Sequence, residues 1–363
     1  MSKVLSNQDL KDILTGATVL GAGGGGPFDL GQQFIDFIGD YKVTLMDASE
    51  MGDAERVAVS AGVGSPTAAA SGFDSMVPTK AWEQLSGMVS DLKYVMPGEI
   101  GAANTLLPMT VCATQGLPLL DTTGARRAMP SLQMATFAAG NIPPSPIVLG
   151  DGTHSLWFHM DDVPAADAAL RGIVTSGTFP GDAGMAFWNM SKADVVASGI
   201  HGTVSCAQQV GAAIRTALAS GSEPISSVLG LFPGSRELFR GTIQSAVQTS
   251  EGGFDLGTLH LKNANGDELV IVNKNENLVA WSPDQTQPLV LAPDLICYLC
   301  TDGTVFSNAD TGLAEKKTVC VLAIPATPQE SQKAVVDAYL GALQQVGYYG
   351  SWRPMVGRGR GRK

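Results

Sequence analysis

The sequence lacks a hydrophobic run long enough to cross a membrane, because its apolar stretches are short and interrupted by Gly, Pro or charged residues. Charged residues are also scarce at 16%, against 44% hydrophobic residues, which excludes a disordered chain and indicates a large buried core. Lys and Arg number 23 and Asp and Glu 34, so the net charge is -11. Because phosphate binding needs a basic face, this acidic balance argues against nucleic acid as a partner.

Cysteine is rare, and its five residues follow no regular spacing, which suits a reducing compartment. The amino terminus has no apolar core of the signal-peptide kind and contains Asp9 and Asp12, so we expect a cytoplasmic protein. Cys297 and Cys300 form a CxxC pair within an apolar, β-prone run. Without a second pair, this spacing favours buried strand cysteines over a redox or zinc site, and we assign no metal-ligating residues.

Familiar catalytic signatures are missing as well. The sequence contains no H-E-x-x-H motif and no G-x-S-x-G nucleophile elbow. Residues 21–26 (GAGGGG) could close backbone amides on an anion, and we single out Gly24 and Gly25 within them. However, this run lacks the Lys-Ser/Thr of a P-loop and the spacing of a dinucleotide site, and it follows a predicted helix. We favour a tight turn beside a substrate pocket over a nucleotide site.

At 363 residues the chain is too long for one typical core, so we expect two domains. Helical and strand-like runs alternate in the first half, as in a mostly parallel sheet. After about residue 240, short β-prone runs are separated by Gly, Asn and Asp turns, with a hairpin signal at 265–267 (NGD). We predict an α/β domain at 1–165, a β-rich α+β domain at 166–350 and a disordered tail at 351–363.

Polar residues cluster where a predicted strand of the first domain ends, which is where open α/β sheets bind ligands. Glu99 could act as a general base or anchor a substrate N–H, and Asn104 is either a ligand or a helix N-cap. Asp121 ends the strand PLLD and is either a ligand or a cap for the turn that follows. Of Arg126 and Arg127, one could hold an anionic group in bidentate fashion.

A second polar cluster lies in the β-rich half. Residues 273–277 (NKNEN) precede an apolar strand, and Asp294 follows close behind. If buried, these amides and carboxylates need hydrogen-bond partners. Both a polar turn and a substrate-binding edge that faces the first domain are consistent with this spacing.

The chain resembles the DUF917 family, also described as S-methyl thiohydantoin desulfurase-like. The matching blocks follow the family's order over nearly the whole chain: residues 20–31 (LGAGGGGPFDLG), 99–108 (EIGAANTLLP), 116–134 (GLPLLDTTGARRAMPSLQM), 239–259, 275–281 (NENLVAW), 292–296 (APDLI) and 347–350 (GYYG). The sequence departs from the family pattern at Ala102-Ala103, where Gly-Gly is usual, and at Asn273-Lys274, where an aromatic residue and Gln are usual. Both changes lie beside the expected pocket, so they bear on substrate identity more than on fold.

The resemblance implies an enzyme related to hydantoinases, a hydrolase of a hydantoin or S-alkyl thiohydantoin ring in which a carboxylate assists attack by water. We expect Glu99 or Asp121 to be the catalytic base and the pocket to lie between the two domains. The resemblance implies Asn104, Arg127, Asn275, Glu276 and Asp294 as substrate-binding residues, and to these we add Gly24, Gly25 and Asn277.

Two alternative functions stay open: a non-catalytic ligand-binding or assembly subunit of a hydantoinase system, and a nucleotide-binding enzyme that uses the glycine run. We expect a small-molecule substrate, no organic cofactor, and no nucleic-acid or membrane partner. A divalent metal, a homo-oligomer and an association with a hydantoinase are left open by the sequence.

Overall fold

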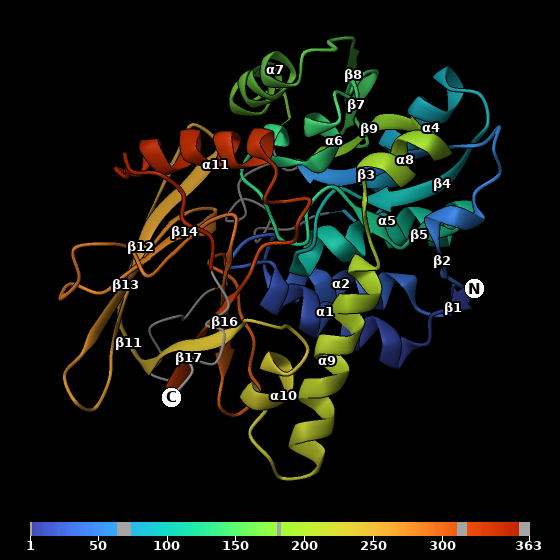
Figure 1. Ribbon diagram of the computed structural model, residues 1–363. Helices are drawn as coiled ribbons and strands as arrows, with labels where there is room; N and C mark the ends of the chain where they lie inside the picture. The colour runs from blue at the N-terminus through green and yellow to red at the C-terminus, as the bar shows by residue number, and fades with distance from the viewer. Residues whose placement is uncertain (1, 64–73, 180–182, 311–317, 356–363) are drawn as a thin grey trace.

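The computed structural model describes residues 2–63, 74–179, 183–310 and 318–355, which form two large sheets and one two-stranded sheet with accompanying helices (Figure 1). In the first sheet the strand order is β1 (Lys3–Val4), β2 (Thr44–Met46), β5 (Leu119–Leu120), β4 (Leu92–Pro97), β3 (Arg56–Val63), β9 (Ala183–Ser191), β7 (Ile147–Gly150) and β8 (Ser155–Phe158). Strands β2, β5, β4 and β3 pair in parallel, whereas β9 pairs antiparallel with β3 and β7. This sheet confirms the predicted α/β class.

The first helix shows how local sequence sets these elements. The Ser6 side chain accepts from the Asp9 N–H at 3.1 Å, and the Asp9 carboxylate accepts from the Ser6 N–H at 2.8 Å, so both free donors at the helix start are satisfied. The helices of this unit are α1 (Asn7–Leu20), α2 (Phe28–Ile38), α4 (Val77–Met88), α5 (Ala102–Gln115), α6 (Thr136–Ala139), α7 (Val163–Thr175), α8 (Lys192–Ser198), α9 (Thr203–Ala219) and α10 (Ile225–Leu229). Short 3-10 turns lie at Ala48–Glu50 and Leu132–Met134, and β6 (Thr122–Thr123) pairs with β10 (Ile200–His201).

The chain returns to the first sheet well after residue 165. Strand β9 inserts between β3 and β7, and α9 packs along α1 so closely that a Cβ atom on Gly16 would lie 1.8 Å from the Ala207 carbonyl oxygen. The boundary predicted at 165/166 falls inside α7, and the second sheet begins only at Arg236. Strand β9 and helix α9 therefore belong spatially with the first unit.

The second sheet is antiparallel throughout its described pairs, which confirms the predicted β-rich unit. Its order is β15 (Val290–Leu291), β14 (Glu276–Trp281), β13 (Glu268–Lys274), β12 (Phe254–Lys262), β11 (Arg236–Glu251), β17 (Thr318–Ile324) and β16 (Leu295–Cys300). The ends of the sheet approach one another, because the Asn277 Nδ2 of β14 donates to the Ile296 carbonyl of β16 at 2.8 Å. The expected turn at 265–267 joins β12 to β13, with Gly266 at φ +92°.

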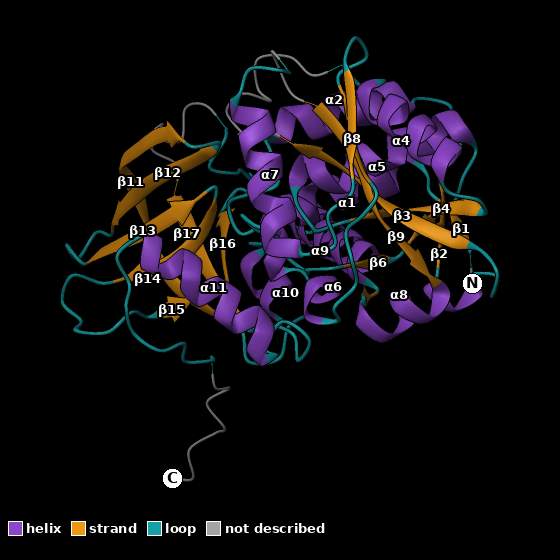
Figure 2. Cartoon of the chain, turned by 90° about the horizontal axis from the view of Figure 1, so that it is seen from above, coloured by secondary structure: helices purple, strands orange, loops and turns teal. Residues whose placement is uncertain are grey.

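Helix α11 (Lys333–Gln345) packs its buried Tyr339 and Leu343 against the second sheet. The view from above shows the two sheets on opposite sides of the molecule, with α1 and α9 between them (Figure 2). One hydrophobic cluster includes Leu14 of α1, Val204 of α9 and Leu299 of β16, so a shared core joins both units. The geometry of any site at their junction is thereby fixed.

The structure also bears on the CxxC cysteines, on membrane-spanning helices and on the carboxyl-terminal tail. Cys297 and Cys300 are buried in β16 and belong to different hydrophobic clusters, which confirms buried strand cysteines. Within the described chain, no helix has the length and apolar character that a membrane span requires. Of the predicted tail, 356–363 lie outside the described residues, and the Met355 N–H donates to the Asp294 carboxylate at 2.8 Å.

Candidate functional site

Glu99 lies in the loop between β4 and α5, and its carboxylate is held at both oxygens. Oε1 accepts from the Asn104 Nδ2 at 2.6 Å, and Oε2 accepts from the Met129 N–H at 2.8 Å. Asn104 is not the N-cap of α5, which is Gly101, so its amide serves Glu99 instead. Glu99 is 9% exposed and therefore keeps little contact with solvent.

Glu276, at the start of β14, brings a second carboxyl to the same region. It is 3% exposed, and its Oε2 has no hydrogen-bond partner among the described residues. A Cβ atom on Gly24 would lie 2.2 Å from its Oε1, so only glycine leaves room for this side chain. The glycine run thus lies directly against a carboxyl group of the other unit.

The two carboxyl groups hold their protons unusually tightly. Burial raises the pKa of Glu99 to about 7, against the hydrogen bonds from Asn104 and Met129. Burial and then the negative charge of Glu99 raise the pKa of Glu276 to about 8. At neutral pH such a pair retains a proton and can both accept and donate one.

Arg127 is a buried link between the two units rather than an open anion binder. Its guanidinium donates to the Asn277 carbonyl at 2.8 Å and to the Asp294 carbonyl at 3.0 Å, and it lies over the Tyr339 ring. Its Nε donates to the Ala128 carbonyl at 3.0 Å. The positive charge lowers the pKa of both glutamates, so Arg127 offsets part of the cost of burying them.

Two cations near the glutamates, Arg171 and Lys274, were not predicted from the sequence as site residues. The Arg171 guanidinium and the Lys274 ammonium are 4.0 Å and 3.7 Å from the centroid of the Phe254 ring. Arg171 also donates to the Pro130 carbonyl at 2.7 Å, beside the residue that holds Glu99. An arginine on an amphipathic helix gives no sequence signal for this contact, because its partners are distant in the chain.

Asp121 is engaged elsewhere. Its Oδ1 accepts from the N–H groups of Val204 and Ser205 at 2.8 and 3.0 Å, and its Oδ2 accepts from the Ser205 hydroxyl. These bonds satisfy the amino end of α9, as expected of a carboxylate at a helix start. None of the hydrogen bonds of Asp121 reaches Glu99 or Glu276.

The asparagines and Asp294 hold backbone in place. The Asn275 Oδ1 accepts from the Asp255 N–H at 2.7 Å, and the Asn277 N–H donates to the Ala22 carbonyl at 2.8 Å. Asp294 accepts from the N–H groups of Ala326 and Met355 at 2.7 and 2.8 Å. The structure thus brings Glu99, Asn104, Gly24 and Glu276 together, with these residues as their support.

The glycine run binds α5 and the loop that carries Asn308 through its carbonyl oxygens. The Gly25 carbonyl accepts from the N–H groups of Ala103 and Asn104 at 2.8 and 3.1 Å, and the Gly23 carbonyl accepts from the Asn308 N–H at 2.7 Å. A Cβ atom on Gly25 would lie 2.3 Å from the Gly101 Cα. These contacts are those of a tight turn between α1, α5 and β14, the interpretation that the sequence favoured.

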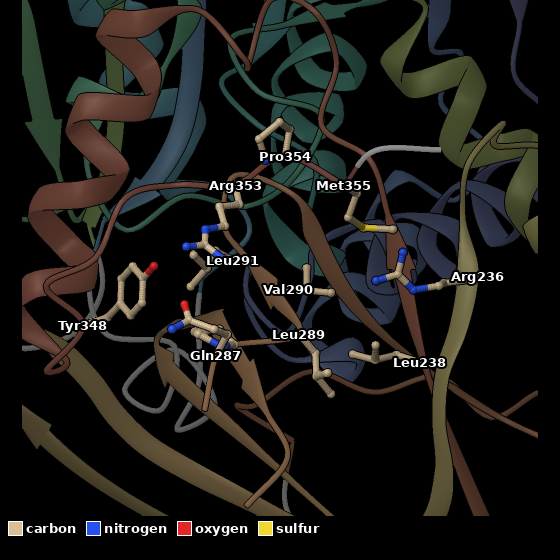
Figure 3. Close-up of a pocket in the computed structure, with 11 residues that line it drawn as sticks. Arg236, Leu238, Gln287, Leu289, Val290, Leu291, Tyr348, Arg353, Pro354 and Met355 are labelled. Carbon is tan, nitrogen blue, oxygen red and sulfur yellow. The ribbon is translucent and has the colours of Figure 1, made fainter. Parts of the chain in front are cut away.

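A separate pocket of about 500 Å³ lies on the second unit, between the start of β11 and the segment after α11 (Figure 3). Arg236 and Arg353 line it together with Tyr348, and no predicted site residue does. Elsewhere in the described chain, no group of three or more His, Cys, Asp and Glu side chains is placed to hold a metal ion. The burial and the raised pKa values of Glu99 and Glu276 make the glutamate pair the candidate functional site.

The fold and this site define a two-part protein with a buried carboxyl pair where the parts meet. The chain belongs to the S-Me-THD-like family: the model of the S-Me-THD-like N-terminal domain matches residues 8–159, and that of the C-terminal domain matches residues 161–347. An X-ray structure of a Chromobacterium violaceum protein, a structural genomics target, is similar at 28% identity and a TM-score of 0.84, over 97% of this chain and 99% of that one. No curated protein matches the sequence.

Proposed function

We propose that the protein is a hydrolase of a five-membered cyclic amide-like ring, of the hydantoin or S-alkyl thiohydantoin type, with Glu99 and Glu276 as its acid–base pair. The buried pair of carboxyls with raised pKa values carries this proposal. Membership of the S-Me-THD-like family supports the ring as substrate. Asp121, the other carboxylate considered as a base, is left out of the proposed pair because its oxygens already bind the amino end of α9.

The chemistry needs one base and one acid. With an S-methyl thiohydantoin, ionised Glu99 takes a proton from water while the water oxygen bonds to the ring carbon that carries sulfur. That carbon–sulfur bond then breaks, and protonated Glu276 supplies the proton with which methanethiol leaves. The products are hydantoin and methanethiol. The Asn104 amide, which binds Glu99, keeps the base oriented.

The test is a panel of hydantoins and S-methyl thiohydantoins, followed by ultraviolet absorbance of the ring and by a thiol-reactive dye. We expect turnover to depend on pH with an acidic limb near 7 and an alkaline limb near 8, the values of the two glutamates. Each assay is run with a chelator, with added zinc and with added manganese, so that a metal requirement is measured directly.

Replacing Glu99 by Gln should lower kcat on the order of 100- to 10,000-fold while the protein stays folded, because the general base is lost. The matched control is Glu268→Gln, which removes an exposed carboxylate from β13 and should leave kcat unchanged. Full activity in Glu99→Gln removes Glu99 from the mechanism. Tight binding of a ring without any product favours the alternative of a non-catalytic subunit.

A further inference from the structure

Asn308, in the loop between β16 and β17, forms hydrogen bonds inside the protein with its backbone N–H and with both polar atoms of its side chain. Its N–H donates to the Gly23 carbonyl at 2.7 Å, and its Nδ2 donates to the Asn275 carbonyl at 2.8 Å and to the Asn277 Oδ1 at 2.9 Å. Its Oδ1 accepts from the Tyr298 hydroxyl at 3.2 Å. The side chain thus holds the residues on both sides of Glu276 and, through its backbone, the glycine run.

Glu276 depends on this support because its own carboxyl is weakly held. Its Oε2 has no hydrogen-bond partner in the described part of the chain, and the preceding Asn275 sits at φ +59°, a conformation that non-glycine residues rarely adopt. Gly24 packs against the carboxyl but offers no side chain to bind it. The backbone that Asn308 holds therefore fixes the point from which the Glu276 side chain extends.

We propose that Asn308 is a positioning residue for Glu276, which fixes that carboxyl against the glycine run and beside Glu99. An amide fits this role because its nitrogen donates two hydrogen bonds while its oxygen accepts one. A carboxylate at this place would face the Asn275 carbonyl and the Asn277 Oδ1 with negative charge. The inference rests on the proposed function, in which Glu276 is the acid.

The charged and titratable groups around Glu276 come from several elements: Glu99 beside α5, Arg127, Arg171 of α7, Lys274 of β13 and Tyr339 of α11. We expect all of these to stay in place when only Asn308 is changed. If Glu276 relaxes away from Glu99 and toward solvent, its pKa falls, because burial and the Glu99 charge are what raise it.

The experiment measures kinetics and titration in Asn308→Ala, Asn308→Asp and Tyr298→Phe. Tyr298→Phe removes the hydroxyl that donates to Asn277 and Asn308 and retains the rest of the ring. We expect kcat to fall on the order of 10- to 100-fold in the Asn308 variants with little change in KM, and less in Tyr298→Phe. The alkaline limb of the pH profile should move to lower pH by about one unit.

The matched control is Asp310→Asn in the same loop, whose carboxylate accepts from the Phe28 N–H at 2.9 Å and the Ser307 N–H at 2.6 Å and takes part in none of the hydrogen bonds described for residues 275–277. It should lower thermal stability without moving the alkaline limb. The titration of Glu276 is followed separately by NMR of protein with ¹³C-labelled glutamate, assigned with Glu276→Gln. This readout needs no substrate, so an inactive panel refutes the proposed hydrolase while still testing Asn308.

A Glu276 titration that is unchanged in folded Asn308→Ala overturns the positioning role. If the Asn308 variants do not fold, an unchanged titration in Tyr298→Phe overturns it in the same way. A shift in Asp310→Asn equal to that of Asn308→Ala also overturns it, because the effect would then belong to the whole loop.

Discussion

At the scale of single residues, the glutamate pair should govern how stability depends on pH. A carboxyl whose pKa is higher in the folded than in the unfolded protein binds its proton more tightly when folded. Its contribution to the free energy of unfolding is therefore present at low pH. For Glu276 this contribution is lost as pH rises from the unfolded pKa of about 4.5 to the folded pKa of about 8. Over that window the loss is on the order of a few kcal/mol.

We therefore expect the melting temperature to fall between pH 5 and pH 9 and to fall less steeply in Glu276→Gln, which carries no titrating proton. The variant should exceed the parent at pH 9 by several degrees, at about 2–4 °C per kcal/mol. Differential scanning fluorimetry across this range measures both curves, with Glu268→Gln as the exposed control. Parallel curves for parent and Glu276→Gln would show that Glu276 ionises as freely as in the unfolded chain.

At the scale of elements, what the sequence could predict was local. The turn at Gly266, which is confirmed, and the Ser6–Asp9 cap both depend on residues a few positions apart. The insertion of β9 between β3 and β7 and the contact of Asn308 with Gly23 join residues far apart in the chain. Periodicity and spacing carry no information on such pairs, so the contacts that support Glu276 could be found only in the structure.

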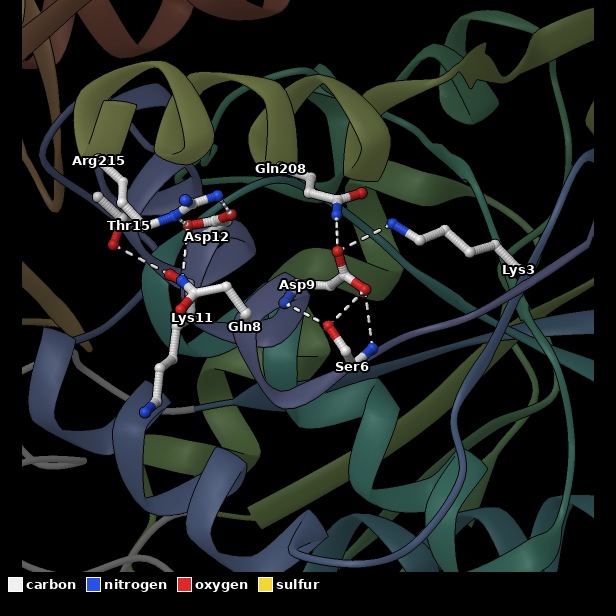
Figure 4. A network of polar contacts seen from close by, with 9 residues as sticks. All are labelled: Lys3, Ser6, Gln8, Asp9, Lys11, Asp12, Thr15, Gln208 and Arg215. Atoms are coloured by element: carbon white, nitrogen blue, oxygen red, sulfur yellow. Dashed lines mark hydrogen bonds and ion pairs between the residues drawn. The ribbon is translucent and has the colours of Figure 1, made fainter. Parts of the chain in front are cut away.

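The contact of α1 with α9 shows this limit most directly. Asp12 binds Arg215 at 2.8 Å, and Asp9 binds Gln208, across the two helices (Figure 4). Between these polar contacts the helices meet at glycine: a Cβ atom on Gly211 would lie 1.9 Å from the Asp12 carbonyl oxygen. The sequence of neither helix indicates that it packs against the other.

Gly211→Ala should push the two helices apart and lower the free energy of unfolding by about 1–3 kcal/mol, the usual cost of overpacking. The matched control is Gly172→Ala inside α7, where nothing lies within 4 Å of the added Cβ. That substitution should be neutral or stabilising by up to about 1 kcal/mol, because alanine favours a helix. Urea denaturation of both variants measures the difference, and equal stabilities would contradict the close approach.

At the scale of the whole molecule, the two units are expected to behave as one. Their shared core includes residues of α1, α9 and β16, and Arg127 ties the first unit to the Asn277 and Asp294 carbonyls of the second. The candidate site lies at this junction, with Glu99 from one unit and Glu276 from the other. Its geometry therefore depends on how firmly the units are joined.

Arg127→Met tests this dependence, because it removes the hydrogen bonds and leaves two buried glutamates with less compensating charge. We expect a loss of stability of about 3–5 kcal/mol, as for other broken buried charge contacts, and a smaller loss in Arg127→Lys, which keeps the charge without the planar fork. Differential scanning calorimetry should show one transition in the parent and one, at lower temperature, in each variant, because the shared core still joins the units. Two separate transitions in Arg127→Met, one of them at the temperature of the parent's single transition, would mean that Arg127 rather than the shared core couples the units.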